Sequence, residues 1–392
     1  MAYFSEYLQK GIANNFDLLT LERKKQLKEI KDLRGGNRDI FVYASDLNKN
    51  APTSICYDDI LYFCDQLPVS KNKAIDIILE TPGGIAEVVE DLVRIIRTKY
   101  DDVAIIVPGY AKSAGTIFAM SADEILMGIS SALGPIDAQI INPNGKIFSA
   151  GAFLNGLEKI KEETRRDKKL ELAYIPILQN ISPGEIETCE NGQQFSQKLV
   201  FEWLHKYKFK NWTKHFKSGK EVTDEEKINT AKEIASKLCD NSQWKTHGKS
   251  LSIEDLEKIG LKITNYSLNK KLEEKILRYY TLLRMSFEIS SIYKIFENEN
   301  TQVYKMIPIA NNINTPDFES IENVVLDVNC PKCNEIHSIV ASFGNILEEN
   351  KDKIVFPSNN VIFCRKCHNK INLAKFRIDI ERQFNKKIVE NS

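Results

Sequence analysis

One stretch of the chain, residues 105–120 (IIVPGYAKSAGTIFAM), constrains the fold more than any other. It begins with a run of apolar residues typical of a buried strand, turns sharply, and continues in small residues that favour a helix. Ser113 stands at this turn, so we expect its hydroxyl to leave the sheet beside the amide of Ala114. That is the geometry of an activated nucleophile next to half an oxyanion hole. The alternative at this point is that Ser113 only caps the helix.

Apolar runs and amphipathic segments alternate through the first third of the chain. The runs predict strands at 39–43, 74–79, 103–107 and 124–127, and the segments between and after them predict helices at 56–67, 85–97 and 114–121. Strands that alternate with helices indicate an α/β fold with a largely parallel sheet and right-handed crossovers.

The rest of the chain changes from helical patterns to short β-like runs. Helices are expected at about 150–170, 185–208, 223–239 and 252–260, followed by a long helix from about 272 to 298. We predict an N-terminal helical segment (1–34), a main α/β domain (35–298), a polar linker (299–322) and a small β domain (323–392).

Composition excludes some classes of function. The 392 residues include 54 basic and 54 acidic side chains, so no global field attracts polyanions. The first ten residues lack the pattern of a signal peptide, and no apolar run reaches the roughly 18 residues that span a bilayer. Four of the eight cysteines form Cys-x-x-Cys pairs and the others are scattered, which fits a reducing compartment. We therefore expect a cytoplasmic protein without a membrane span.

Two glycine-containing turns follow consecutive predicted strands. They are Gly83-Gly84 and the turn at Ser113, and both emerge at the carboxyl edge of a parallel sheet, where sites form. The amides of Gly84 and Ala114 would then supply the two donors of an oxyanion hole. The alternatives for Gly83-Gly84 are a simple turn or a phosphate cradle, although the Gly-Lys-Ser/Thr of a P-loop is missing.

Four motifs in order carry a family resemblance. They are residues 81–84 (TPGG), 111–116 (AKSAGT), 122–128 (ADEILMG) and 133–139 (LGPIDAQ). Together they resemble the serine dehydrogenase proteinase family of the Clp protease and crotonase superfamily, which also contains signal peptide peptidase A. The resemblance covers about residues 35–265. It implies a Clp-like superhelical α/β core, a serine peptidase with Ser113 as nucleophile and Gly84 and Ala114 as oxyanion donors, protein or peptide substrates, and homo-oligomers.

The general base is a separate question, because no histidine lies between Ser113 and His205. Clp peptidases use a Ser-His-Asp triad, but the place of their histidine falls near Asp137, and His247 lies near the place of their aspartate. We therefore predict an exchanged triad in which His247 is the base and Asp137 orients it, since triads tolerate any chain order. The alternatives are a surface histidine at 247 and a turn residue at 137.

A Ser-Lys dyad, as in signal peptide peptidase A, is the competing arrangement. A buried lysine with a lowered pKa can deprotonate serine. Lys112 adjoins the nucleophile in sequence, although adjacent residues usually point apart, while Lys168 and Lys169 sit in a run of charge that is typical of a solvated face.

The cysteine pairs form a separate signal. Cys330-x-x-Cys333 and Cys364-x-x-Cys367 each follow a β-like run and have the spacing of zinc ligands. Four thiolates would hold a structural Zn²⁺ and stabilise a small zinc ribbon that has little core of its own. A Cys₄ site leaves no open position for catalysis, and His337 and His368 are interpreted as bystanders. The basic knuckle tips, with Lys332 among them, can face nucleic acid, a protein partner or solvent.

The sequence therefore leads to one main hypothesis and two alternatives. The main one is a cytoplasmic serine peptidase with a Clp-like core, a Ser113 acyl-enzyme and an appended zinc ribbon. The first alternative is a catalytically inactive Clp-like scaffold whose ribbon binds protein or nucleic acid. The second is a crotonase-like acyl-CoA enzyme, which has no need of a serine at 113 and ranks lowest.

Overall fold

The structure is a computed structural model that describes residues 2–141, 147–215, 219–246, 248–308, 322–344, 354–384 and 386–389. The chain divides into two compact units, Met1–Ile307 and Pro308–Ser392. Each unit is described by itself. Within the described residues, none of the helices combines the length and the apolar character that crossing a bilayer requires.

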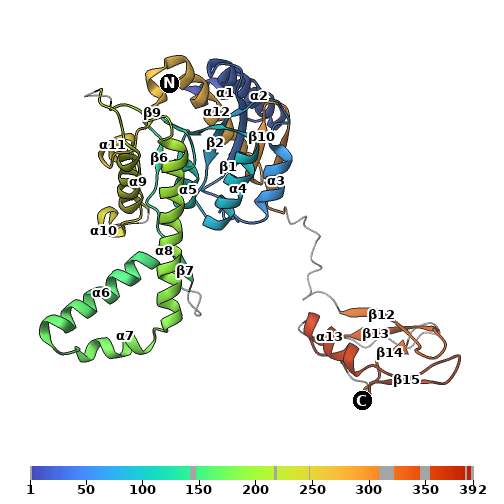
Figure 1. Cartoon of the computed structure of the whole chain (residues 1–392). Helices are drawn as coiled ribbons and strands as arrows, with labels where there is room; N and C mark the ends of the chain where they lie inside the picture. The colour runs from blue at the N-terminus through green and yellow to red at the C-terminus, as the bar shows by residue number, and fades with distance from the viewer. Residues whose placement is uncertain are drawn as a thin grey trace. The chain divides into compact units, whose positions relative to one another are not determined.

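A seven-stranded, mostly parallel sheet forms the centre of the first unit (Figure 1). The strand order is β11-β10-β1-β2-β3-β5-β9, in which β1, β2, β3, β5 and β9 run parallel and β10 and β11 run antiparallel at one edge. Its strands are β1 (Asp39–Ser45), β2 (Ala74–Glu80), β3 (Asp102–Val107), β5 (Glu124–Met127), β9 (Thr264–Asn265), β10 (Ile292–Asn298) and β11 (Gln302–Met306). The predicted strands and the predicted α/β class are confirmed.

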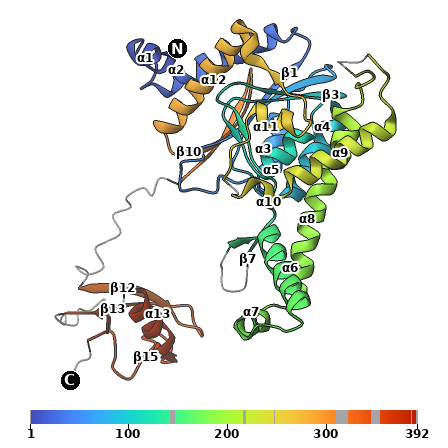
Figure 2. The ribbon, with the colours of Figure 1, turned by 90° about the vertical axis from the view of Figure 1, so that its left-hand side faces the viewer.

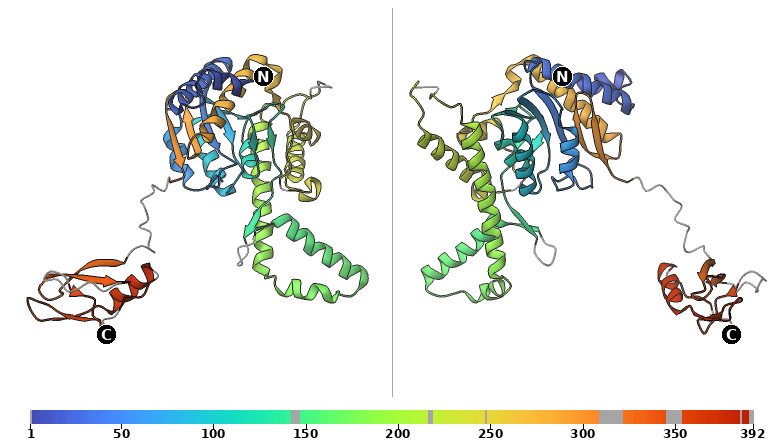
Figure 3. Two further views of the ribbon diagram at one scale, coloured as in Figure 1. Left: turned by 180° about the vertical axis from the view of Figure 1, so that it is seen from behind. Right: turned by 45° about the vertical axis from the view of Figure 1, so that its right-hand side comes forward.

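Helices cover both faces of this sheet because its strands are buried on both sides. In β1, Phe41 belongs to a core beneath α3 (Asp59–Gln66), α4 (Ala86–Lys99) and α5 (Ala114–Met120). Its neighbour Val42 belongs to the opposite core, beneath α2 (Phe16–Leu33) and α12 (Lys270–Glu288). This alternation is the period-two pattern of a strand covered on both faces. Helices α1 (Tyr3–Gln9), α2 and α12 lie together on one face (Figure 3).

Four of the remaining helices of the first unit follow the predicted ranges closely, and two short ones, at 175–179 and 241–244, are not predicted. These helices are α6 (Ala150–Asp167), α7 (Ile175–Gln179), α8 (Pro183–Trp203), α9 (Asp224–Leu238), α10 (Asn241–Trp244) and α11 (Ile253–Lys258), with short 3₁₀ turns at Leu172–Tyr174 and Tyr266–Leu268. Helix α8 extends away from the sheet, and α6 and α7 accompany its outer half as an arm (Figures 1 and 2). The short strands β4 (Tyr110–Ala111), β6 (Ala132–Leu133), β7 (Gln139–Ile141) and β8 (Ile147–Ser149) pair outside the main sheet.

The predicted long helix at 272–298 is wrong over its last third. Helix α12 ends at Glu288, and residues 292–298 form β10, which pairs antiparallel with β1. The apolar spacing of α12 continues into this segment, so the sequence pattern does not mark the end of the helix. β-Branched and aromatic residues at 292–296 favour a strand once an edge of the sheet is available. The predicted linker range contains the edge strand β11, and residues 309–321 lie outside the described residues.

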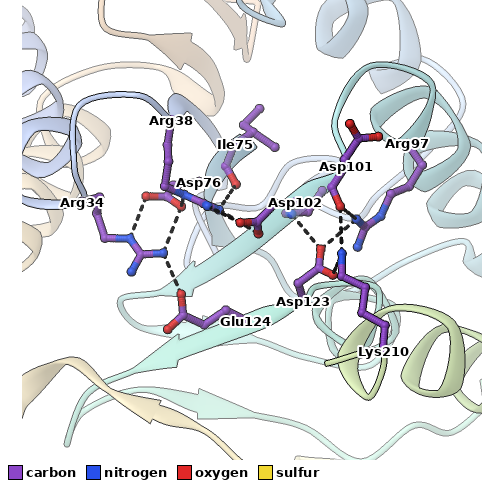
Figure 4. Close-up of polar contacts among 11 residues, drawn as sticks. Arg34, Arg38, Ile75, Asp76, Arg97, Asp101, Asp102, Asp123, Glu124 and Lys210 are labelled. Carbon is purple, nitrogen blue, oxygen red and sulfur yellow. Dashed lines mark hydrogen bonds and ion pairs between the residues drawn. The ribbon is translucent and has the colours of Figure 1, made fainter. Parts of the chain in front are cut away.

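Ion pairs close the amino edge of the sheet, opposite the predicted site (Figure 4). Asp76 near the start of β2 accepts from Arg34 at 2.9 Å and from Arg38 at 2.6 Å. Both guanidinium groups are largely buried, and Asp76 is almost fully buried. Paired charges of this kind fix the end of α2 and the loop before β1 to the start of β2.

The second unit is a small β domain with one helix. Its strands are β12 (Asn323–Asn329), β13 (Ile336–Ser342), β14 (Ile354–Val355), β15 (Val361–Phe363) and β16 (Lys370–Asn372), and its helix is α13 (Ala374–Phe384). Strands β12, β13 and β14 form one sheet, and β15 and β16 form a hairpin. The small core includes Cys330 and Cys364, so two of the predicted metal ligands are also core residues.

Candidate active site and metal centre

The turns after β2 and β3 are joined by backbone hydrogen bonds. The amide of Thr81 donates to the carbonyl of Tyr110 at 2.9 Å, and the amide of Lys112 donates to the carbonyl of Thr81 at 3.0 Å. This isolated parallel bridge brings the Gly83-Gly84 turn beside Ser113. The structure therefore places the two predicted turns together at the carboxyl edge of the sheet.

Ser113 occupies a strained backbone conformation immediately before α5. Its φ is 49° and its ψ is −115°, a region that costs a non-glycine residue about 1–3 kcal/mol. Its side chain makes no capping hydrogen bond to the helix, so the capping alternative has no support. A serine held in this way at a strand-to-helix turn is typical of a nucleophile elbow.

Gly83 lies against the backbone of the serine turn. A Cβ at this position would stand 2.7 Å from the carbonyl oxygen of Lys112 and 2.8 Å from the Cβ of Ser113. The φ of Gly83 is also +106°, which side chains rarely adopt. Only glycine therefore allows the two turns to approach this closely.

Two backbone donors remain available at this junction. Among the residues that the structure describes, no acceptor receives the N–H of Gly84 or of Ala114. The Ala114 amide begins α5, where the first amides of a helix have no partner within it. The bridge between Gly84 and Ile55 does not use the Gly84 amide. Its two hydrogen bonds run from the Ile55 amide to the Gly83 carbonyl and from the Ile85 amide to the Ile55 carbonyl.

A cavity of about 500 Å³ opens over these groups. Ser113, Gly84 and Ala114 line it together with Asp137, and apolar side chains such as Phe195 of α8 complete its walls. The cavity therefore combines a hydroxyl, the two amides and a carboxylate with room for a peptide segment.

Asp137 is 6% exposed and accepts a hydrogen bond from the Ser149 hydroxyl at 2.8 Å. It also lines a second cavity of about 620 Å³, together with Ser242 and Lys245. Burial and the Asp137 charge raise the pKa of the nearby Cys239 to about 12. Asp137, which is predicted to orient the base, is therefore a buried carboxyl group between two cavities.

His247, the predicted general base, lies outside the described residues. The chain on either side of it is described. Lys245 shares a cavity with Asp137, and Ser250 contacts the residue next to Ser113. The flanking residues therefore reach the neighbourhoods of both other members of the predicted triad.

Lys112, the predicted alternative base, already makes hydrogen bonds to other residues. Its ammonium group donates to the Ser250 hydroxyl at 2.8 Å and to the Lys249 carbonyl at 3.1 Å. Burial and then the neighbouring Lys249 ammonium lower its pKa. Lys168 begins the charged turn after α6 in a left-handed conformation, and neither Lys168 nor Lys169 lines the cavity of Ser113.

Glu80 holds the segment before Ser113 by a hydrogen bond to the backbone of Tyr110. It is not among the site residues that were predicted from the sequence. Its buried carboxyl group accepts the amide of Tyr110 at 2.8 Å and the hydroxyl of Tyr280 at 2.9 Å. Burial raises its pKa from 4.5 to about 7. A single carboxylic acid at the end of β2 carries no recognisable sequence signal, because its partner Tyr280 lies 200 residues away in the sequence.

The Glu80→Gln variant should change how stability depends on pH. Between pH 4.5 and about 7 the folded wild type binds a proton that the unfolded chain has lost, so its unfolding free energy falls as pH rises. The full loss is about 3 kcal/mol, because one pKa unit corresponds to about 1.4 kcal/mol. Glutamine does not titrate, so the variant should match the wild type near pH 4.5 and exceed it above pH 7.

Urea unfolding followed by tryptophan fluorescence measures this difference, because Trp203, Trp212 and Trp244 all lie in the first unit. Glu90→Gln is the matched control, since Glu90 is exposed on α4. Parallel stability curves for wild type and Glu80→Gln would show that the pKa of Glu80 is not raised.

The four predicted zinc ligands converge in the second unit. Their sulfur atoms all lie within 4.8 Å of one another. The Cys330 and Cys367 sulfurs are 3.6 Å apart, and those of Cys333 and Cys364 are 3.5 Å apart. A tetrahedral zinc ion with Zn–S bonds of about 2.3 Å sets its sulfurs about 3.8 Å apart, so the cluster has the dimensions of such a site.

The two knuckles repeat one backbone geometry. The amide of Asn334 donates to the Cys330 carbonyl at 2.9 Å, and the amide of His368 donates to the Cys364 carbonyl at 2.9 Å. Asn334 and His368 both have positive φ. His368 is therefore a turn residue, and the buried His337 belongs to β13 rather than to the sulfur cluster.

Part of the first unit is similar to known proteins. Residues 66–220 match the family described as ClpP-like SDH-type serine proteinase. Two proteins of Methanocaldococcus jannaschii, the uncharacterized proteins MJ1495 and MJ0137, are 30% and 28% identical over 210 and 193 residues. These matches cover 53% and 49% of this chain and 58% and 54% of the relatives. The chain thus spans little more than half the length of the curated relatives it matches.

A solved structure is also similar. It is a serine-to-alanine mutant of the 1510-N membrane-bound stomatin-specific protease, with 19% identity and a TM-score of 0.27, covering 51% of this chain and 69% of that one. The resemblance inferred from the motifs is confirmed by the family match, which includes the Gly83-Gly84 turn, Ser113 and Asp137. Over residues 66–220 the chain is therefore similar to the ClpP-like SDH-type serine proteinase family.

Proposed function

We propose that the chain is a serine endopeptidase in which Ser113 forms the acyl-enzyme. The observation that carries the proposal is the strained Ser113, which shares a cavity with the free amides of Gly84 and Ala114. The family match supports a peptide bond as the substrate class.

In the proposed reaction, Ser113 Oγ attacks the peptide carbonyl carbon while the base removes the hydroxyl proton. The carbonyl oxygen becomes an oxyanion and accepts from the amides of Gly84 and Ala114. Each such donor is worth about 2.7–4 kcal/mol in other serine peptidases. The protonated base then gives its proton to the leaving amine, and water repeats the sequence to release the acyl group.

We assign the base to His247 and its orientation to Asp137. The described residues that flank His247 support this assignment, because they reach both the Asp137 cavity and the neighbour of Ser113. Lys112 is the weaker candidate, since its ammonium group already has the Ser250 hydroxyl and the Lys249 carbonyl as partners.

Variants of the two candidate bases separate these assignments. His247→Ala should lower kcat/KM for peptide cleavage about 10³-fold or more, because loss of a triad base removes most of the chemical acceleration. Lys112→Ala should stay within about fivefold of wild type. His205→Ala is the matched histidine control, since His205 stacks on Phe201 away from the cavity. The reverse ranking would establish a Ser-Lys dyad.

A non-hydrolytic scaffold is the second candidate function. The observation in its favour is that, within the described chain, no histidine or lysine nitrogen hydrogen-bonds to the Ser113 hydroxyl. Unliganded sites often tighten only with substrate, so the peptidase remains the better supported function. A scaffold would leave peptides intact at every pH tested.

We further propose that the second unit holds a structural zinc ion and that the chain acts in the cytoplasm as a homo-oligomer. The sulfur distances support the metal. The homo-oligomer is what the resemblance to Clp proteases implies, and the cytoplasmic location rests on the composition. For the knuckle tips we retain protein and nucleic acid as candidate partners. One of the basic side chains, Lys366, is paired with Glu335 at 3.3 Å, which reduces the charge available for phosphates.

A further inference from the structure

A second large cavity lies at the amino edge of the sheet, opposite Ser113. Its volume is about 700 Å³, and it borders the first residues of β5 and β9, Glu124 and Thr264. Lys208, Trp212 and Lys262 line it as well. Because Ser113 follows the carboxyl end of β3, this cavity and the candidate active site lie at opposite edges of the sheet.

The two acidic residues of this cavity are neutralised by cations outside its lining. Asp123 pairs with Arg97 at 2.8 Å and with Lys210 at 2.5 Å. Glu124 pairs with Arg34 at 2.7 Å and also accepts from the Thr264 hydroxyl at 2.8 Å. Figure 4 shows Asp123 directed toward Arg97 and Lys210, and Glu124 directed toward Arg34.

The cations that do line the cavity have no such partners. Within the described chain, Lys208, Lys214 and Lys262 have no carboxylate oxygen within 4.0 Å. The Lys208 ammonium group reaches only the backbone carbonyl of Asp123, at 3.5 Å. Burial lowers the pKa of Lys208 to about 8; the Lys262 charge adds to this, while the Glu124 and Asp123 charges oppose it. The cavity therefore carries excess positive charge that an anion would satisfy.

The backbone delivers Lys208 to this position by an irregular turn. Helix α8 ends in a π-helical turn, Leu204–Lys208, which is rare and frequent at functional sites. The turn brings the Lys208 ammonium group to the backbone carbonyl of Asp123, just before β5. Phe209 and Trp212 follow the turn, and their ring centroids lie 5.3 Å apart. An aromatic wall thus adjoins the ammonium groups.

We propose that this cavity binds a small organic molecule carrying a phosphate group. Several ammonium groups around one space suit an anion with more than one charge and at least three acceptor oxygens. The volume exceeds the size of inorganic phosphate, and the aromatic residues Phe209 and Trp212 in the lining would contact a planar group beside the phosphate. A phosphomonoester with a planar body, such as a nucleoside monophosphate, meets both conditions.

Calorimetric titration of the full chain with AMP, adenosine, ribose 5-phosphate and inorganic phosphate tests this proposal. AMP should bind, and its affinity should fall with added salt because ammonium–phosphate attraction is screened. Adenosine should bind at least tenfold more weakly, since it lacks the charge. Ribose 5-phosphate and inorganic phosphate lack the planar base, so both should bind with lower affinity than AMP. AMP should therefore have the highest affinity of the four ligands.

Single variants locate the binding. Lys208→Gln and Lys262→Gln should each weaken AMP at least tenfold, while Lys206→Gln should bind as the wild type does, because Lys206 lies on the same turn but outside the cavity. AMP should also change the tryptophan emission of the wild type and not that of Trp212→Phe. Lys262 is exposed, so its variant gives a result even if Lys208→Gln does not fold.

Absence of AMP binding at millimolar concentration would overturn the proposal. Equal affinity for AMP and adenosine, or unchanged affinity in Lys262→Gln, would do the same. The proposal does not depend on peptidase activity, so AMP should bind Ser113→Ala as tightly as wild type.

Discussion

Ser113→Ala is expected to abolish peptide cleavage while leaving the fold intact. The nucleophile forms the covalent bond, so its removal should lower kcat by about 10⁵- to 10⁶-fold, to the level left by binding and the oxyanion hole. Turnover of fluorescently labelled casein measures this loss. Alanine keeps the same backbone strain as serine, so the urea midpoint from tryptophan fluorescence should shift little.

The exposed Ser130 supplies the matched control for that variant, because it does not line the cavity. Ser130→Ala should cleave casein at the wild-type rate. If Ser113→Ala retained more than a few per cent of wild-type activity, another nucleophile would be required and the scaffold function would fit Ser113 better.

Removal of the metal is expected to unfold the second unit and spare the first. A structural zinc site contributes about 10–16 kcal/mol in small zinc domains, more than the whole stability of a typical small domain. The second unit has a small core in which Cys330 and Cys364 are themselves buried members. The first unit forms its own core around the seven-stranded sheet, so its tryptophan unfolding curve should not move.

Metal analysis and limited proteolysis check this expectation. Wild type should contain about one zinc per chain, and Cys364→Ser should lose it and become rapidly cleaved within the second unit. Cys64→Ser is the control, because Cys64 is an exposed cysteine in the first unit. Retention of zinc and protease resistance in Cys364→Ser would mean that the four sulfurs are not the ligand set.

The sequence predicted the parts of the fold that depend on local pattern. Each strand from β1 to β5 in the main sheet is a run of apolar residues between turn residues, and a parallel sheet brings their carboxyl ends together. The turn at Ser113 carries its own signal, because Gly83 and the small residues after Ser113 are required for the close approach. The Cys-x-x-Cys pairs likewise specify their turns locally.

Long-range pairing set the limit of prediction. The segment of β10 is predicted as helix because the apolar spacing of α12 continues into it, whereas the edge of β1 that it joins lies about 250 residues away in the sequence. Glu80 and its partner Tyr280 are separated in the same way. The cavity around Lys208 is lined by residues from the end of α8 and from the starts of β5 and β9. Because these segments are far apart in the sequence, no local motif predicts the cavity.

Fluorophosphonate labelling tests the central claim most directly. The probe reacts covalently with a serine only where a base and an oxyanion hole activate its hydroxyl. We expect one phosphonyl group per wild-type chain, located by peptide mass spectrometry at Ser113 and absent from Ser113→Ala. A chain that stays unlabelled, or a label on another serine that persists in Ser113→Ala, would contradict the assignment of Ser113 as the nucleophile.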